Sequence, residues 1–310
     1  MRSLICGSLA FDSIMVFHGH FKNHILPDKI HILNVSFLVP DMRREYGGCA
    51  GNIAYNLKLL GGEPIIMATT GEDFGPYRDR LTELGLSLEC IRQVDGSYTA
   101  QAFITTDLSD NQITAFHPGA MNQSHLNDAS AARDIRLGIV SPDGREGMLA
   151  HCEQLHRASI PFIFDPGQGM PLFNGDELMQ MVRQADYVTL NDYEAELLQS
   201  RTGQTLQQLA EHVKCLIVTK GAEGSQFYLG STVLQIPAAP VRGVIDPTGC
   251  GDAFRAGLIY GISSGMDWNT IGRLASLMGA IKIEYRGGQN HTPSRLEVEE
   301  RFASSFGYRL

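Results

Sequence analysis

The chain has 310 residues, of which 43% are hydrophobic, and this is enough for one large α/β domain or two small ones. Its formal net charge of −9 argues against nucleic acid or an anionic membrane surface as a partner. No apolar run reaches the roughly 18 residues that span a bilayer, and the first residues lack a secretory signal pattern, so we expect a cytoplasmic protein.

The first predicted strand covers Ser3–Ser8, and Asp12 follows it. A carboxylate just after the first strand of an open α/β sheet lies where such sheets bind ligands. A turn or cap residue is an equally good interpretation of this stretch alone. Residues 13–46 are rich in Ile, Val and Phe without a helical period, so short strands such as Ile30–Val35 are predicted there.

A glycine-rich motif, G-G-C-A-G-N-I-A-Y-N-L-K-L-L-G-G, covers Gly47–Gly62. Two glycines precede a predicted helix, because Ile53, Leu57 and Leu60 recur at helical spacing. The spacing does not match the dinucleotide fingerprint G-x-G-x-x-G. The glycines either allow the helix to pack closely against the sheet or allow a ligand to approach the backbone.

The next predicted elements are a strand at Pro64–Thr69 and a helix that ends near Leu84. Thr99–Phe116 then has the pattern of a β-hairpin, with two alternating runs on either side of a turn at Asp107–Asn111. Together with the strands of residues 13–46, we expect this hairpin to form a lid over a substrate.

From about residue 135, strands and helices alternate, which is typical of βαβ units in a parallel sheet. Strands are predicted at Leu137–Val140, Pro161–Phe164, Tyr187–Leu190, Cys215–Thr219 and Gln226–Leu229. Several strands end at polar or glycine residues, namely Asp165, Gln168, Asn191, Glu194, Thr219, Lys220 and Gly221. Any one of these is more often a turn or cap residue, but their recurrence favours a ligand site at the carboxyl ends of the strands.

The most specific motif is V-I-D-P-T-G-C-G-D-A-F-R-A-G at Val244–Gly257. We expect Asp246 and Pro247 to close a strand and a helix to run from about Asp252 to Tyr260. A helix N-terminus binds anions through its free N–H groups and its dipole. Asp252 would repel an anion there, unless it accepts a proton from a hydroxyl that attacks a phosphoryl group. The alternative is that Asp252 only caps its helix.

After this motif, Trp268–Tyr285 is predicted to form another amphipathic helix, Y-R-G-G at 285–288 a turn, and the tail after Thr292 a terminal helix. The motifs in this order resemble the ribokinase-like (PfkB) family of sugar and nucleoside kinases over essentially the whole chain. The signature around Asp252 is similar to the family's D-T/P-x-G-A-G-D, with Cys250 in place of the commoner Ala. The motif at Gly47 is similar to the family's G-G-x-x-x-N.

This resemblance implies a three-layer α/β fold, in which helices flank a mainly parallel central sheet. It implies one domain over residues 1–310 with a small β-sheet lid, formed by strands from about 13–46 and 98–117. The implied reaction is phosphorylation of the 5′-hydroxyl of a nucleoside by ATP.

The resemblance also implies roles for individual residues. Asp252 would be the catalytic base, and Gly249, Cys250 and Gly251 would form the anion hole. Substrate would be held by Asp12, Gly47, Gly48, Asn52, Gln112, Asp165 and Gln168. ATP would lie near Asn191, Thr219, Lys220, Gly221, Gly249 and Gly251. Asn191 and Glu194 would organise Mg²⁺ largely through waters, and Asp246 and Thr248 match part of a site for a monovalent cation such as K⁺.

Among acceptors, adenosine or another nucleoside is the first choice. Ala10 replaces an Asn that is usual in ribokinases, while D-N-Q-I-T-x-F, F-D-P-G-Q and Arg255 are similar to bacterial and archaeal nucleoside kinases. The alternatives are a kinase for ribose, fructose or a related sugar, and a nucleoside-binding protein that has lost catalysis. A homodimer that pairs through the lid is expected, because exposed sheet edges are commonly paired.

Overall fold

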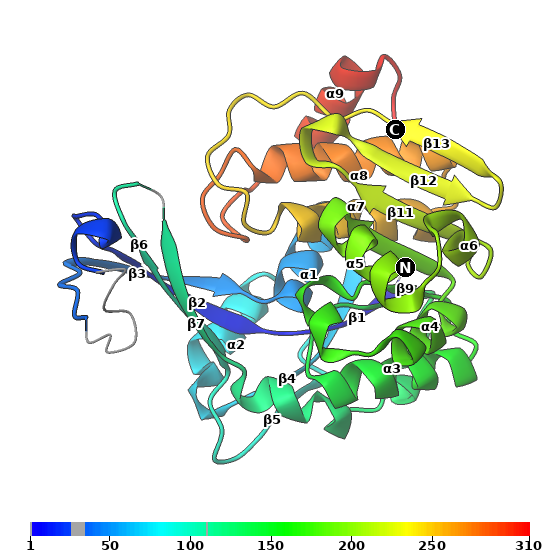
Figure 1. Cartoon of the computed structure of the whole chain (residues 1–310). Helices are drawn as coiled ribbons and strands as arrows, with labels where there is room; N and C mark the ends of the chain where they lie inside the picture. Colours follow the sequence, from blue (N-terminus) through cyan, green and yellow to red (C-terminus); the bar gives the residue numbers. More distant parts are fainter. Residues whose placement is uncertain (1, 26–34, 110) are drawn as a thin grey trace.

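The computed structural model describes residues 2–25, 35–109 and 111–310, which form a large and a small β-sheet with flanking helices (Figure 1). The large sheet has nine strands in the order β13-β12-β11-β10-β9-β8-β1-β4-β5. In chain order these strands are β1 (Arg2–Cys6), β4 (Glu63–Thr70), β5 (Ile91–Gln93), β8 (Leu137–Val140), β9 (Phe162–Phe164), β10 (Tyr187–Asn191), β11 (Cys215–Thr219), β12 (Ser225–Leu229) and β13 (Thr232–Ile236). Neighbours from β5 to β11 pair in parallel, and the pairs β11–β12 and β12–β13 at one edge are antiparallel, so the predicted mainly parallel sheet is confirmed.

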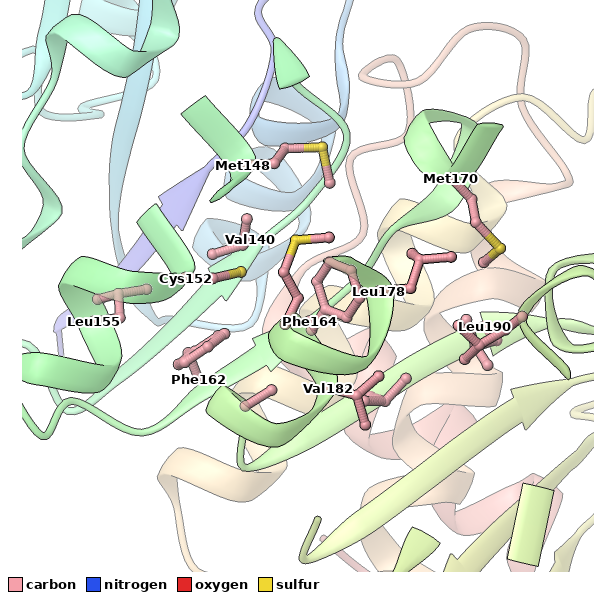
Figure 2. Packing of buried hydrophobic residues seen from close by; sticks show 14 of the residues in the cluster. Val140, Met148, Cys152, Leu155, Phe162, Phe164, Met170, Leu178, Val182 and Leu190 are labelled. Atoms are coloured by element: carbon pink, nitrogen blue, oxygen red, sulfur yellow. The ribbon is translucent and has the colours of Figure 1, made fainter. Parts of the chain in front are cut away.

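Alternate residues of the buried strands point to opposite faces and form two apolar clusters. On one face, Val140, Phe162, Phe164 and Leu190 pack with Met148 and Val182 (Figure 2). The helices that cover this face are α3 (Arg145–Arg157), α4 (Gly175–Gln184), α5 (Asp192–Thr202) and α6 (Leu206–Ala210).

On the other face, Ile5, Ile139 and Ile163 pack under a second set of helices. These are α1 (Cys49–Leu59), α2 (Gly75–Glu83), α7 (Cys250–Ser263) and α8 (Trp268–Lys282), while α9 (Arg295–Phe306) lies outside against α8. The three layers of the predicted fold class are therefore present. No helix in the described ranges is long and apolar enough to cross a membrane.

The small sheet extends from one side of the large one (Figure 1). Its strands are β2 (Ala10–Val16), β3 (Asp41–Gly47), β6 (Ala100–Thr106) and β7 (Gln112–His117), in the order β3-β2-β6-β7. The predicted hairpin is confirmed, because β6 and β7 pair antiparallel. The predicted strand Ile30–Val35 lies, except for its last residue, outside the described residues.

Short 3₁₀ helices connect several elements: η1 (Phe21–Asn23), η3 (Glu72–Phe74), η4 (Gly119–Leu126), η5 (Ala129–Ala131), η6 (Gly167–Leu172) and η7 (Gly221–Glu223). The predicted strand that ends at Asp246 and Pro247 was wrong. Residues 237–249 form an irregular loop, in which Val244 and Ile245 are 70% and 57% exposed. Three prolines in this loop have no N–H to donate, and the N–H groups of Ile245 and Asp246 donate to Ile283 O at the end of α8.

Candidate active site

The most specific sequence motif forms the N-terminus of α7, which begins at Cys250, two residues earlier than predicted. Gly249 is the N-cap residue in the left-handed region, with φ of 77°, where a side chain would be strained. The N–H of Cys250 donates to Pro247 O, but those of Gly251 and Asp252 donate to no acceptor among the described residues. Two backbone donors are thus free beside the positive end of a helix dipole.

Asp252 is the third residue of α7, and its carboxylate contacts the glycine-rich motif at Gly47–Gly62. Asn52 on α1 donates a hydrogen bond from Nδ2 to Asp252 Oδ2 at 2.9 Å. Burial raises the pKa of Asp252 from 3.8 to about 6, against the opposing effects of the Asn52 hydrogen bond and of Arg255. A carboxylate with such a pKa is mostly ionised at neutral pH and can accept a proton.

Asn52 is positioned by a hydrogen-bond network with Gln289 and Tyr77, two residues that the sequence did not identify as part of the site. Gln289 Nε2 donates to Asn52 Oδ1 at 3.1 Å and lies 2.7 Å from the Tyr77 hydroxyl, which donates to Gly47 O at 2.8 Å. All three side chains are buried. The only sequence signal was the position of Gln289 next to the predicted Y-R-G-G turn.

Asp12 lies on β2 of the small sheet, rather than at the edge of the large sheet. Its pKa is raised to about 6 by burial and by the charges of Glu45 and Asp246. A Cβ on Gly47 would lie only 2.5 Å from Asp12 Oδ2, so the carboxylate lies directly against the glycine backbone. Gly48, with φ of 86°, packs so closely on the backbone of Ser8 that a Cβ would lie 2.5 Å from its carbonyl oxygen.

Behind the N-terminus of α7, Arg255 forms a buried ion pair with Asp165. Its Nε and Nη2 atoms donate to the two carboxylate oxygens at 2.5 and 2.7 Å. Arg255 Nη2 also lies 4.0 Å from Glu194 Oε2. Both oxygens of Asp165 are therefore already bound, and Arg255 connects the end of β9 to α5 and α7.

At the N-terminus of α5, Asn191 and Glu194 form a capping box. Asn191 Oδ1 accepts from Glu194 N at 2.7 Å, and Glu194 Oε2 accepts from Asn191 N at 2.8 Å. Burial and Asp165 raise the pKa of Glu194, although Arg255 opposes this. Within the described part of the chain, Glu194 Oε1 makes no hydrogen bond, and no group of three or more His, Cys, Asp or Glu could hold a metal.

Other predicted site residues lie at the edges of the two sheets, at different distances from Asp252. Thr219 pairs with Asn191 in the β10–β11 register, and Lys220 and Gly221 follow it at the same edge of the sheet. Gln168 is exposed in η6, three residues after Asp165. Gln112 is exposed and, by the strand register, shares the sheet face of Asp12, but it lies two strands away and four residues, or about 13 Å, further along the strand direction.

Asp246 joins the loop before α7 to the turn after α8. Its carboxylate accepts from Thr248 N at 2.9 Å and from Gly287 N at 2.8 Å. Lys282 approaches the same place from α8, and its Nζ donates to Asp246 O at 2.7 Å and to Tyr285 O at 3.0 Å. No motif in the sequence marked this lysine.

The chain is similar in sequence and structure to known kinases. A model of the pfkB family of carbohydrate kinases matches residues 12–295. The chain is 31% identical over 306 residues to a nucleoside kinase from Methanothermobacter thermautotrophicus, covering 96% of this chain and 97% of that protein. It is 30% identical over 271 residues to a nucleoside kinase from Methanocaldococcus jannaschii, covering 86% and 89%. The structure of the Burkholderia thailandensis nucleoside kinase in complex with inosine superimposes with a TM-score of 0.91 and 55% identity, over 99% of both chains.

Proposed function

The chain belongs to the pfkB family of carbohydrate kinases, and we propose that it transfers the γ-phosphate of ATP to the 5′-hydroxyl of a nucleoside. The observation that carries this proposal is the hydrogen bond between Asn52 and Asp252. It brings the two glycine-rich motifs together at a helix N-terminus with free backbone donors. A base, an anion site and a site for a hydroxylated ring then adjoin one another.

In the proposed mechanism, Asp12 and Asn52 bind the ribose hydroxyls while the backbone of Gly47 and Gly48 lies against the ring. The 5′-hydroxyl faces Asp252, which takes its proton as the oxygen attacks the γ-phosphate. The N–H groups of Gly251 and Asp252 then stabilise the charge on the phosphoryl oxygens. Asp165 acts through Arg255, which fixes the start of α7.

The family implies ATP together with a divalent metal. Mg²⁺ usually keeps several waters and takes only one or two carboxylates besides the phosphates. Glu194 fits this requirement because its Oε1 atom accepts no hydrogen bond from the described residues, while Asn191 fixes the position of the carboxylate through the capping box. Bound there, Mg²⁺ would neutralise charge on the phosphates. Thr219, Lys220 and Gly221 would flank the nucleotide at the neighbouring strand end.

We propose a purine nucleoside as the acceptor. The presence of inosine in the B. thailandensis enzyme supports a purine, and the two archaeal relatives are nucleoside kinases. Adenosine remains the prediction from sequence. Gln112 and Gln168 are the proposed contacts to the acceptor beyond its ribose.

The test is ADP release with ATP and Mg²⁺ across adenosine, inosine, guanosine, cytidine, ribose and fructose. Turnover on nucleosides supports the proposal and ranks the bases. Turnover only on free sugars would make the protein a sugar kinase. Nucleoside binding by calorimetry without turnover on any acceptor would make it a binding protein.

We also propose a homodimer through the small sheet. Met42, Phe103 and Ile113 are exposed apolar residues that, by the strand register, share the face opposite Asp12. Light scattering on the wild type and on Phe103→Glu tests this, since the charge should produce monomers if the face is buried between two copies.

A further inference from the structure

Lys282 is a buried lysine that contacts the loop preceding the anion site. It is the last residue of α8 and its side chain is 0% exposed. Its Nζ donates to two backbone carbonyls, Asp246 O at 2.7 Å and Tyr285 O at 3.0 Å. A lysine is rarely buried unless its charge is compensated.

The surroundings of Lys282 provide this compensation. Burial lowers the pKa of Lys282, but Cys250, Asp246 and Asp252 act in the opposite direction. The two carbonyls belong to the loop that leads into Gly249 and to the turn at residues 285–288. Lys282 thus links the two backbone segments that meet beside the N-terminus of α7, where Gly249 lies against Gly288.

Two backbone carbonyls next to a carboxylate are also ligands of the kind that hold a monovalent cation. Asp246 and Thr248 were predicted to belong to such a site. The residues present do not fit a K⁺ ion between these carbonyls, because the ion would overlap the ammonium group of Lys282. Asp246 is further occupied by the N–H groups of Thr248 and Gly287.

We propose that the ammonium group of Lys282 takes the place of a bound monovalent cation. It fixes the loop at residues 246–249, which leads into the anion site, and makes phosphoryl transfer independent of K⁺. Lys282 is a positioning residue, since it acts through the backbone of residues 246–251 and contacts no reacting group. The part of this inference that concerns catalysis rests on the proposed kinase function. The part that concerns the loop does not, and it can be measured without substrate.

The experiment compares the wild type with Lys282→Met, which keeps an unbranched side chain, one atom shorter, and removes its charge. Lys58→Met is the matched control, because Lys58 Nζ also donates to a carbonyl, Gly85 O at 3.0 Å, but at an exposed position away from the site. Phosphoryl transfer and Tm are measured at constant ionic strength, with tetramethylammonium chloride exchanged stepwise for KCl or NH₄Cl.

We expect K⁺ to leave kcat/KM of the wild type and of K58M within about twofold, below the tenfold that a 1.4 kcal/mol interaction would give. In the absence of K⁺, kcat/KM of K282M should fall by about 10²-fold, the cost of misplacing catalytic groups by about 1 Å. K⁺ or NH₄⁺ should restore part of this activity and raise the Tm of K282M but not that of the wild type, because a free ion can then occupy the space of the ammonium group.

The inference is overturned if K⁺ activates the wild type tenfold or more, about 1.4 kcal/mol, a result that does not depend on whether the variant folds. It is also overturned if K282M keeps full activity without K⁺, or if neither its activity nor its Tm responds to any cation. If no acceptor is phosphorylated by the wild type, the kinase proposal fails, whereas the response of Tm to K⁺ still tests the role of Lys282.

Discussion

Asn52 donates a hydrogen bond of 2.9 Å to Asp252 across a separation of 200 residues in the chain. This hydrogen bond links the glycine-rich start of α1 to the start of α7. It also orients the Asp252 carboxylate, which adjoins the N–H groups at the start of that helix. Variants of these two residues therefore give the most direct tests of the site.

Asp252→Asn should abolish most of the activity, because an amide cannot accept the proton of the attacking hydroxyl. We expect kcat/KM to fall by about 10²- to 10⁴-fold, the usual contribution of a general base. Asp79→Asn is the matched control, since Asp79 is an exposed carboxylate on α2. Equal activity of the wild type and D252N would exclude Asp252 as the base.

The same variant should be more stable than the wild type at neutral pH. Burial raises the pKa of Asp252 from 3.8 to about 6, so the folded protein holds this proton where the unfolded chain has released it. The protonated form of Asp252 therefore contributes fully to the stability of the folded wild type below about pH 4, and this contribution is lost as the pH rises through about 6. We expect D252N to raise Tm by about 2 °C near pH 7.5, after allowance for partial exposure, and to leave it unchanged near pH 4.

The pH dependence of kcat/KM should reflect the ionisation of the carboxylates of Asp12 and Asp252. Asp12 and Asp252 both have a pKa of about 6, and the proposed mechanism uses both in their ionised forms. We expect kcat/KM to rise with pH up to about 6 to 7 and then to level off. Asn52→Leu removes a hydrogen bond that lowers the pKa of Asp252, so it should shift this limb to higher pH. The exposed Asn269→Leu should not, and an unshifted limb in N52L would contradict the assignment.

Breaking the Arg255–Asp165 pair should destabilise the fold, because one buried charge then remains uncompensated. We expect Arg255→Met to lower the free energy of unfolding by about 3–5 kcal/mol, as measured by urea denaturation. The double variant with Asp165→Asn should regain part of this loss, since neither charge remains. A double variant that only adds the two losses would show that the residues act independently.

A methyl group on Gly47 should weaken acceptor binding selectively. The new Cβ of Gly47→Ala would lie 2.5 Å from Asp12 Oδ2 and would push the carboxylate away. We expect KM for the nucleoside to rise about tenfold, equivalent to about 1.4 kcal/mol, with KM for ATP unchanged. Gly75→Ala serves as the control because its added Cβ meets no atom closer than 4.0 Å. An equal rise in both KM values would point to a general distortion.

The elements that could be predicted from the sequence are those whose own residues form a recognisable pattern. The parallel strands have continuous apolar runs, and the two glycine motifs open helices, so their elements and the fold class are confirmed. That Asn52 and Asp252 are in contact agrees with the order of the motifs, although their catalytic roles remain predictions.

Other parts had no local signal or a misleading one. Val241–Ile245 has the β-branched composition of a strand, but prolines nearby and hydrogen bonds to the end of α8 make it a loop. The contacts of Gln289 with Tyr77 and Asn52 connect residues more than 200 positions apart and leave no periodic pattern. Lys282 stands among apolar residues of a helix, where its burial follows only from the position of the two carbonyls.

The packing of α7 against α1 has a consequence for the synthesis of the chain. Ile53 on α1 and Ile5 on β1 share one apolar cluster with Phe254 and Leu258, which lie some 200 residues later. At a synthesis rate of about 5–20 residues per second, these apolar residues stay uncovered for about 10–40 s before α7 has been made. Such non-local contacts slow folding and leave the nascent chain open to aggregation, so its yield in the cell should depend on chaperones that bind exposed apolar segments.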